Sequence, residues 1–458
     1  MKKSRSSFTG KLGFVLAAAG SAVGLGNLWR FPYLAAQHGG GIFLLVYLIL
    51  SVTFGFSLLI AEIAIGRKTG LSAIGAFQTL HKKCTFIGYL AAIIPVLILP
   101  YYSVIGGWVI KYLTVFCTGK TESAANDGYF ESFIGSTGQS LLFFAVFIGI
   151  TALVVLLGVE KGVEKVSKIM MPILAALSVG IAAFVCISGA IKGEWDGILY
   201  YIKPDFSNFS IMTVVAAMGQ LFYSMSLAMG IMITYGSYMK KDVSLEASAH
   251  QIEFFDMGIA FFAGLMIVPA VVNYSGIEGL NKGPGLMFVT LPKVFNEMGP
   301  VIGTVIGAVF FLLVFFAALT SSISLMETVV SNVLDKFHIK RETTCLIILG
   351  GAFVLGIPSA LGFGAWSNVT PMGMDILTFF DFLTNSILMP IVSILICLMI
   401  CYIIKPKTVI EEVSVTGKFK LAKLFKGMIY VAPILLLVIL VFAIFEAFNI
   451  TFNGFLKF

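Results

Sequence analysis

The stretch that decides the fold runs from Gly20 to Asn27, reads GSAVGLGN, and stands midway along the first long apolar run of the chain. Each glycine inside a helix costs about 1 kcal/mol relative to alanine. Backbone groups left unpaired against lipid are costlier still, so irregular backbone is tolerated in a membrane only beside protein or a cavity. We therefore predict that a membrane helix is unwound here beside a binding cavity. The alternative is that Gly24 and Gly26 only let two helices pack closely.

Composition places the surrounding chain in a membrane. Its 458 residues are 59% hydrophobic and 12% charged, with a mean hydropathy of +1.00, which leaves too little polar surface for a water-soluble globule. Apolar runs long enough to cross a bilayer recur along the sequence, and such runs must be helical because lipid offers the backbone no partners. We expect an all-α polytopic protein with one membrane domain over residues 1–458. Eleven spans are predicted, near residues 11–37, 41–66, 86–116, 139–157, 165–190, 211–239, 248–274, 299–334, 343–360, 374–404 and 428–449.

The distribution of basic residues predicts the orientation of these spans. If the N-terminus is cytoplasmic, 22 of the 30 lysine and arginine residues fall in the six cytoplasmic segments. Eleven spans then place the C-terminus outside a plasma membrane or bacterial inner membrane. Because the charges are spread over six separate segments, they do not indicate a nucleic-acid partner. The lipid bilayer is the partner that this pattern predicts.

A second interruption is predicted at Ser224 to Gly230, halfway along the sixth span, where the sequence reads SMSLAMG. Spans one and six each begin a block of five helices, residues 11–190 and 211–404, with 428–449 as an additional helix. Breaks at corresponding positions are typical of transporters built from inverted repeats. The N-terminal end of a half-helix suits a carboxylate, and freed carbonyl groups suit Na⁺ or an ammonium group.

Five ionisable residues fall inside predicted spans, where an unpaired charge costs at least about 2.5 kcal/mol: Arg30, Glu62, Asp256, Glu327 and Asp381. Glu62 stands near the cytoplasmic end of its span, so we interpret it as an ion-pair partner or a side chain that reaches the interface. Asp256 lies deeper in its span and is interpreted as a cation ligand.

At these residues the chain resembles the neurotransmitter:sodium symporter family, in particular its bacterial amino acid transporters. The resemblance spans nearly the whole chain and is most specific over residues 19–33, AGSAVGLGNLWRFPY. Further matches are GGG at 39–41, Tyr101-Tyr102, GQLFYSMSL at 219–227 and LTSS at 319–322. The resemblance implies symport of an amino acid into the cell with sodium by alternating access, without an organic cofactor and without enzymatic chemistry.

The resemblance also implies two sodium sites. The first would comprise the substrate carboxylate with Ala22, Asn27, Ser224 and Asp256. The second would comprise carbonyl groups of Gly20, Val23 and Ala317 and the hydroxyls of Thr320 and Ser321. Taken alone, hydroxyl residues in the eighth span would indicate back-bonding or close packing. Asp256 stands where many relatives have Asn, and its fixed charge could replace the chloride that animal relatives require, so we expect chloride-independent transport.

The substrate site follows from the same resemblance. The amides of Leu25 and Gly26 and the Tyr102 hydroxyl would bind the carboxylate, while carbonyl groups near Ala22, Tyr223 and Ser224 and the Ser226 hydroxyl would bind the ammonium group. The side-chain pocket would be lined by Ile98, Tyr102, Tyr223, Met229 and Leu325. Met229 stands where a leucine-transporting relative has Phe, and its flexible thioether favours large hydrophobic or aromatic L-amino acids.

Two gates are expected on either side of this pocket. The outer gate would comprise Arg30 and Asp381 above the rings of Tyr102 and Tyr223. The inner gate would comprise Arg5 and Asp335 with Tyr238.

Three other functions are compatible with some of these features. A transporter of the same fold driven by protons or another cation is the nearest, because Asp256 could titrate. A channel would need a continuous polar pore, whereas the polar residues cluster at two breaks and two gates. A membrane enzyme would need a nucleophile or metal-binding motif, and the sequence offers neither.

Overall fold

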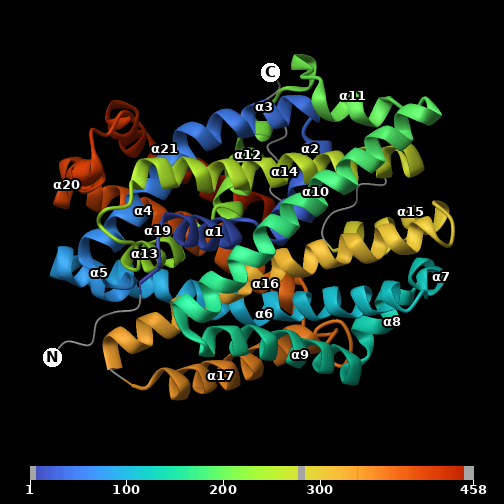
Figure 1. The fold of residues 1–458 in the computed structure, drawn as a ribbon, viewed down its shortest axis with the longest axis horizontal. Helices are drawn as coiled ribbons and strands as arrows, with labels where there is room; N and C mark the ends of the chain where they lie inside the picture. The colour runs from blue at the N-terminus through green and yellow to red at the C-terminus, as the bar shows by residue number, and fades with distance from the viewer. Residues whose placement is uncertain (1–6, 277–283, 338, 448–458) are drawn as a thin grey trace.

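The computed structural model describes residues 7–276, 284–337 and 339–447. Its long helices run roughly side by side and form one elongated bundle (Figure 1). They are built from α3 (Gly41–Leu50), α4 (Phe56–Thr69), α6 (Thr85–Cys117), α9 (Thr137–Leu156), α10 (Lys165–Lys192), α14 (Leu245–Ser275), α16 (Ile302–Phe337), α17 (Arg341–Leu361), α18 (Ile376–Asp381), α19 (Met389–Leu398) and α21 (Ala422–Ala447), of which α3 with α4 and α18 with α19 each form parts of one continuous span. Wider π-helical segments join or extend some of them: η2 (Ser51–Gly55), η4 (Val159–Glu164), η9 (Phe382–Leu388) and η10 (Met399–Ile404).

The predicted membrane spans correspond to these helices. Within the described residues, nine helices are long and apolar enough to cross a membrane, and a bent pair, Lys11–Ala22 with Gly26–Gln37, forms a tenth. The remaining predicted span, 211–239, is divided between α12 (Ile211–Ser224) and α13 (Ile231–Ser237). The fold class is therefore confirmed as an all-α polytopic membrane protein. The grouping into two five-helix repeats stays a prediction.

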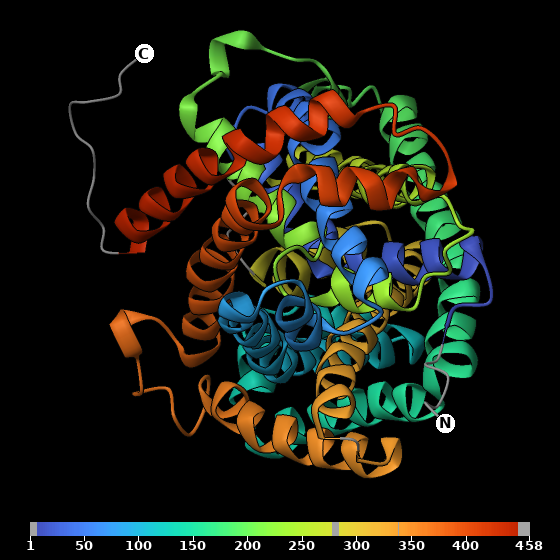
Figure 2. The same ribbon diagram turned by 90° about the vertical axis from the view of Figure 1, so that its left-hand side faces the viewer.

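The broken spans lie inside the bundle and the regular ones surround them. The first is formed by α1 (Lys11–Ala22), η1 (Gly26–Arg30) and α2 (Phe31–Gln37), and α1 packs against α10, α14 and α16. By contrast, α21 lies on the outside of the bundle (Figure 2), where only 22% of its most apolar window is buried. Apolar side chains exposed in this way are stable against lipid, and the irregular backbone is covered by protein.

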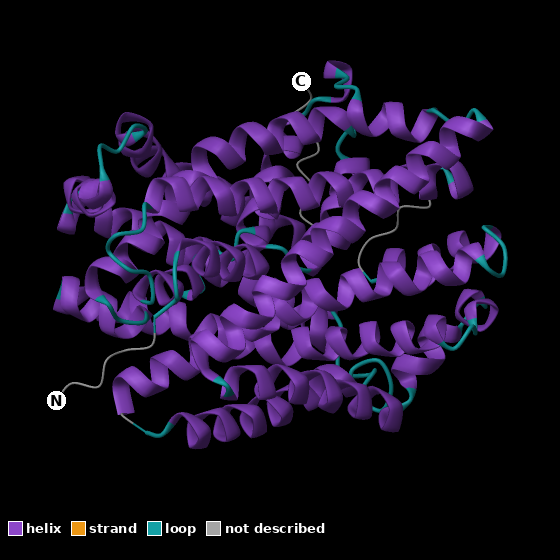
Figure 3. Ribbon diagram, in the orientation of Figure 1, coloured by secondary structure: helices purple, strands orange, loops and turns teal. Residues whose placement is uncertain are grey.

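Short helices and loops close both ends of the bundle, and Figure 3 shows only helices and loops in the part of the chain that the structure describes. The short helices are α5 (Ala73–Leu80), α7 (Thr121–Ala125), α8 (Tyr129–Gly135), α11 (Asp196–Ile202), α15 (Leu291–Glu297) and α20 (Pro406–Val413). Single turns lie at η3 (Lys82–Cys84), η5 (Phe206–Asn208), η7 (Leu286–Thr290), η8 (Pro371–Gly373) and η11 (Ser414–Thr416). Polar caps fix several helix starts; the Ser210 hydroxyl, for example, accepts the Thr213 N–H at the start of α12.

Candidate functional site

The first span is broken at the glycine-rich stretch. α1 ends at Ala22, and Val23 has an extended backbone with φ −76° and ψ 100°. The two halves of the span meet at an angle of 53°. A Cβ atom on Gly24 would lie 2.7 Å from Ser321 Oγ, and one on Gly26 would lie 2.3 Å from the Tyr223 ring. Both interpretations of these glycines therefore apply, because the chain unwinds here and also packs too closely for a side chain.

The sixth span is broken between Ser224, where α12 ends, and Ile231, where α13 begins. Ser226 and Ala228 have left-handed backbones with φ 53° and 65°. This conformation costs a residue other than glycine about 1–2 kcal/mol, so surrounding contacts must hold it.

One such contact comes from Glu62, whose Oε1 accepts the Ala228 N–H at 2.6 Å. The Glu62 side chain is buried, with 2% of its surface exposed. Its interpretation as an ion-paired or interface-seeking residue was therefore wrong. The helix continues beyond the predicted end of the second span, to Thr69, so Glu62 lies further from the interface than the sequence indicated.

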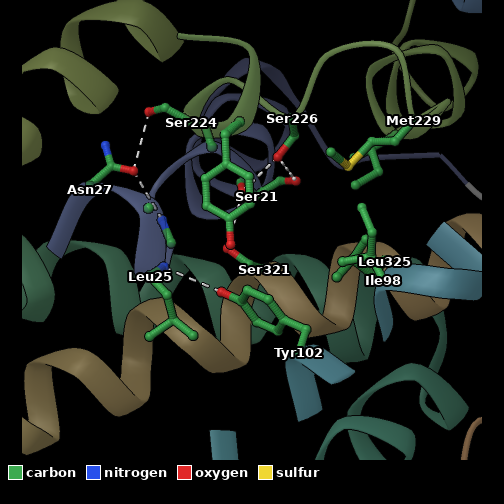
Figure 4. A pocket seen from close by; sticks show the side chains of 15 residues that line it. Ser21, Leu25, Asn27, Ile98, Tyr102, Ser224, Ser226, Met229, Ser321 and Leu325 are labelled. Atoms are coloured by element: carbon green, nitrogen blue, oxygen red, sulfur yellow. Dashed lines mark hydrogen bonds between the residues drawn. The ribbon is translucent and has the colours of Figure 1, made fainter. Parts of the chain in front are cut away.

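The two breaks face each other across a cavity (Figure 4). All ten residues predicted to bind substrate line it: Ala22, Leu25, Gly26, Ile98, Tyr102, Tyr223, Ser224, Ser226, Met229 and Leu325. Ser21, Gly24, Asn27, Ile231 and Ser321 line it as well. Its free volume is about 30 Å³, whereas ligand pockets usually measure about 300–1,000 Å³. A bound amino acid would therefore require the lining side chains to move apart.

One end of the cavity carries hydrogen-bond donors suited to a carboxylate. The Leu25 N–H points at the Tyr102 hydroxyl, with 3.4 Å between nitrogen and oxygen. Leu25 precedes η1, so this N–H belongs to the N-terminal end of a half-helix, where the backbone dipole favours an anion. The opposite end, at Ile98, Met229 and Leu325, is apolar (Figure 4).

Three of the predicted ligands of the first sodium ion, Asn27, Ser224 and Asp256, lie together, and the Asp256 side chain is fully buried. The fourth, Ala22, lines the cavity. Asp256 Oδ1 accepts from Asn27 Nδ2 at 2.8 Å and from Ser224 Oγ at 2.5 Å. Asp256 Oδ2 accepts from the Tyr47 hydroxyl at 3.2 Å. Ser224 Oγ also lies 3.2 Å from Asn27 Oδ1. The structure thus gathers a carboxylate, an amide oxygen and a hydroxyl, a donor set of oxygens that fits a hard cation such as Na⁺.

The predicted ligands of the second sodium ion lie between α1 and α16. Ser321 Oγ is 3.4 Å from the Gly20 carbonyl oxygen and 3.3 Å from that of Val23. The Thr320 hydroxyl bonds back to its own helix, 2.9 Å from the Phe316 carbonyl oxygen and 3.2 Å from that of Ala317. Back-bonding therefore describes Thr320 in this structure, whereas Ser321 faces the broken span. These oxygens also fit a hard cation.

At the predicted outer gate, Asp381 accepts from the Tyr101 hydroxyl at 3.2 Å and from Asn385 Nδ2 at 2.6 Å. The Arg30 guanidinium lies 5.3 Å from the centre of the Tyr223 ring. Within the described residues, Arg30 and Asp381 do not form a direct ion pair. Arg30 therefore rests on an aromatic face, and Asp381 is held by neutral donors.

At the predicted inner gate, Arg5 lies outside the described residues. Asp335 accepts from the Ser72 backbone N–H at 2.8 Å and from its hydroxyl at 2.6 Å. The Tyr238 hydroxyl donates to Glu327 at 2.8 Å, which gives this intramembrane carboxylate a partner.

Four functional candidates were missed by the sequence reasoning. Tyr47 joins the first cation site through its bond to Asp256. Gln220 Nε2 donates to the Gly26 carbonyl of the first break at 3.0 Å. Ser21 and Ser324 bond to each other at 2.7 Å beside the cavity. The signal available for Ser21 and Gln220 was their place inside the matched stretches; Tyr47 and Ser324 carry no comparable signal.

Comparison with known proteins places this geometry in context. The model of the Sodium:neurotransmitter symporter family matches residues 5–127 and 127–457. The uncharacterized sodium-dependent transporter YhdH of Bacillus subtilis is 34% identical over 441 residues, 94% of this chain and 95% of that protein. The sodium-dependent serotonin transporter of Drosophila melanogaster is 26% identical over 410 residues, 78% of this chain and 64% of that protein. The crystal structure of MhsT in complex with L-phenylalanine superimposes with a TM-score of 0.87 and 35% identity, covering 96% of this chain and all of that one.

Proposed function

Because the chain belongs to the sodium:neurotransmitter symporter family, whose members are sodium-dependent transporters, we propose that it carries hydrophobic or aromatic L-amino acids into the cell with two sodium ions. The observation that carries the proposal is the cavity between two unwound segments. A zwitterion needs donors for its carboxylate and acceptors for its ammonium group, and unwound backbone supplies both. The L-phenylalanine bound in MhsT supports an amino acid as substrate.

The preference for large apolar side chains rests on one wall of the cavity. Ile98, Met229 and Leu325 offer no polar atom except the Met229 thioether. Methionine has several rotatable bonds, so its side chain can move aside for a large substrate more easily than a ring can. The Tyr102 and Tyr223 rings complete an apolar enclosure that favours aliphatic and aromatic groups over charged ones.

Coupling to the first sodium ion would follow from shared ligands. The substrate carboxylate would lie near Leu25 and would also coordinate the ion held by Asn27 and Ser224, so neither binds well alone. Asp256 would supply the negative charge that balances the ion. We therefore propose that transport does not require chloride.

Alternating access would proceed by opening one gate at a time. In Figure 1 the bundle has two ends, one with α5, α13 and α20 and the other with α7, α8, α11 and α15. The first end coincides with segments predicted to be cytoplasmic from their lysine and arginine content. This supports a cytoplasmic location for that end of the bundle and for the inner gate. We propose the orientation predicted from the sequence, with the N-terminus inside and the C-terminus outside.

Proton coupling is the second candidate, and the geometry of Asp256 is the observation that favours it. The carboxylate is fully buried and its hydrogen-bond donors are neutral, so a proton could replace the ion. Uptake into proteoliposomes decides between the two. With radiolabelled phenylalanine, we expect uptake that requires an inward sodium gradient and persists when gluconate replaces chloride.

Sodium symport would be overturned if, with choline in place of sodium and the external pH held fixed, phenylalanine uptake were driven by an inward proton gradient. Competition by each of the twenty amino acids would then define selectivity, with hydrophobic and aromatic ones expected to compete most strongly. Recovery of chemically unchanged ligand from purified protein would separate binding from enzymatic turnover.

A further inference from the structure

Three buried serines from three different spans meet beside the cavity. Ser21 lies in α1, Ser226 in the break of the sixth span and Ser324 in α16, with 3%, 5% and 0% of their surfaces exposed. The Ser226 hydroxyl donates to the Ser21 carbonyl at 2.9 Å, and the Ser21 hydroxyl points at Ser226 Oγ at 3.2 Å. Ser324 Oγ lies 2.7 Å from Ser21 Oγ and also 2.7 Å from the Ser321 carbonyl oxygen of its own helix. Ser21 is therefore the hub of this cluster, as its bond to Ser226 in Figure 4 illustrates.

The Ser21 carbonyl also contacts the second cation site. Ser321 Oγ lies 3.1 Å from this oxygen, closer than to the carbonyl oxygens of Gly20 and Val23. A serine hydroxyl has a single hydrogen to donate. Where the Gly20 and Val23 carbonyls face a cation, and the Tyr102 hydroxyl faces the substrate carboxylate, the Ser21 carbonyl is the nearest acceptor left to Ser321. The hydrogen of Ser321 then points at Ser21, and its lone pairs face the ion.

The same carbonyl orients Ser226 at the ammonium end of the cavity. The hydrogen of Ser226 is directed to Ser21, so a lone pair of Ser226 Oγ is left for an ammonium N–H. A backbone carbonyl has two lone pairs and can accept both hydroxyls together. One peptide group thereby sets the direction of two ligands that belong to different sites.

We propose that Ser21 is a positioning residue that couples the second sodium site to the ammonium group of the substrate. This inference rests on the proposed function. The hydrogen bond between the Ser21 side chain and Ser324 on α16 holds the end of α1, and with it the Ser21 carbonyl, in a fixed position relative to both sites. Because coupling between two binding sites is reciprocal, a bound ion favours the substrate and a bound substrate favours the ion to the same extent.

The test is equilibrium binding to the purified Ser21→Ala variant, with radiolabelled phenylalanine as the probe at a series of sodium concentrations. Loss of the hydrogen bonds that the Ser21 hydroxyl makes with Ser226 and Ser324 predicts at least about fivefold weaker phenylalanine binding. It also predicts that more sodium is needed for half-maximal binding, whereas sodium binding in the absence of amino acid changes less than about twofold. Affinity for 3-phenylpropanoate, which has the ring and carboxylate but no ammonium group, should also change less than about twofold.

A double-mutant cycle with Ser324→Ala tests whether Ser324 acts through Ser21. We expect each single variant to weaken phenylalanine binding and the double variant to be no weaker than Ser21→Ala, because the two residues share one bond. Ser178→Ala is the matched control, since Ser178 is fully buried and, in the part of the chain that the structure describes, bonds only to the Leu174 carbonyl of its own helix, at 2.8 Å. That variant should bind both probes as the wild type does.

Equal losses for phenylalanine and 3-phenylpropanoate would overturn the inference, since they indicate a distorted pocket. Additive single effects would also overturn it, as would wild-type behaviour of Ser21→Ala. If the wild-type protein itself binds no amino acid in sodium, the proposed function fails instead. The two failures are therefore distinguishable.

Discussion

Replacing Asp256 by asparagine tests the first sodium site, because the substitution removes a charge and keeps the shape of the side chain. Ser224 Oγ is 2.5 Å from the carboxylate and 3.2 Å from Asn27 Oδ1. An ion held by Ser224 and Asn27 would therefore lie within about 4 Å of the charge. Opposite unit charges at about 4 Å attract by about 4 kcal/mol at an effective dielectric constant of about 20. This energy corresponds to roughly a thousandfold in affinity as an upper bound, and we expect at least a tenfold loss.

The assay is sodium-dependent binding of radiolabelled phenylalanine to purified protein, in chloride and in gluconate. The wild type should give the same half-saturating sodium concentration in both salts. Asp256→Asn should raise the half-saturating sodium concentration because the negative charge is lost. The rise should be the same in chloride and in gluconate, because the amide still fills the space that a chloride ion would need. Asp256→Ala should leave the donor groups of Asn27, Ser224 and Tyr47 aimed at one vacated space that suits an anion. Chloride should therefore partly restore sodium binding in the alanine variant only.

Glu253→Gln serves as the control, because Glu253 is a buried carboxylate on the same helix that accepts from Ser51 at 3.4 Å and lies outside the proposed ligand set. It should leave the half-saturating sodium concentration within about twofold of the wild type. Unchanged sodium activation in Asp256→Asn would refute the first sodium site as described. If chloride restored sodium binding in both Asp256 variants, the idea that chloride fills the space left by the removed carboxylate would be refuted.

Three further substitutions test the cavity and its breaks. Tyr102→Phe removes the hydroxyl that faces the Leu25 amide. Because a hydrogen bond to a charged group contributes about 1.5 kcal/mol, phenylalanine binding should weaken about tenfold while sodium binding stays unchanged. Wild-type affinity for phenylalanine would contradict this role of Tyr102. Gly26→Ala should abolish phenylalanine binding because its Cβ would lie 2.3 Å from the Tyr223 ring. In the same binding assay, the double variant with Tyr223→Ala should bind as well as Tyr223→Ala alone if that contact is the cause. Ala228→Gly should stabilise the protein by about 1 kcal/mol, because glycine adopts the left-handed backbone without strain; a lower melting temperature in detergent would show that Ala228 is not strained.

Much of the fold follows from the sequence because the bilayer restricts the possible structures. A run such as residues 86–116 must be helical to satisfy its backbone, and α6 extends only one residue beyond it at either end. The break after Ala22 was also predictable, since glycines are the residues that weaken a helix. The short helices α7, α11 and α15 were not predicted because their sequences lack a long apolar run.

The site was less accessible to sequence reasoning. In the sixth span the left-handed positions are held by Ser226 and Ala228, and neither residue type indicates such a backbone. The bond between Glu62 and Ala228 joins residues 166 positions apart, and no local pattern encodes it. Placement of the ten cavity residues came from the matched motifs, whereas the connections through Ser21 depend on packing that a single sequence does not reveal.

If peptide groups act as ligands as proposed, this has a consequence for how such a protein changes over evolutionary time. Every amino acid type supplies the same peptide N–H and C=O groups, apart from the N–H that proline lacks, so a substitution in the unwound segments seldom deletes a peptide ligand. The wall formed by Ile98, Met229 and Leu325 consists of side chains and is free to vary. Binding of the amino and carboxylate groups, which all amino acids share, is therefore separate from binding of the side chain, which distinguishes them. Substitutions in the side-chain wall can change substrate selectivity without loss of ion coupling.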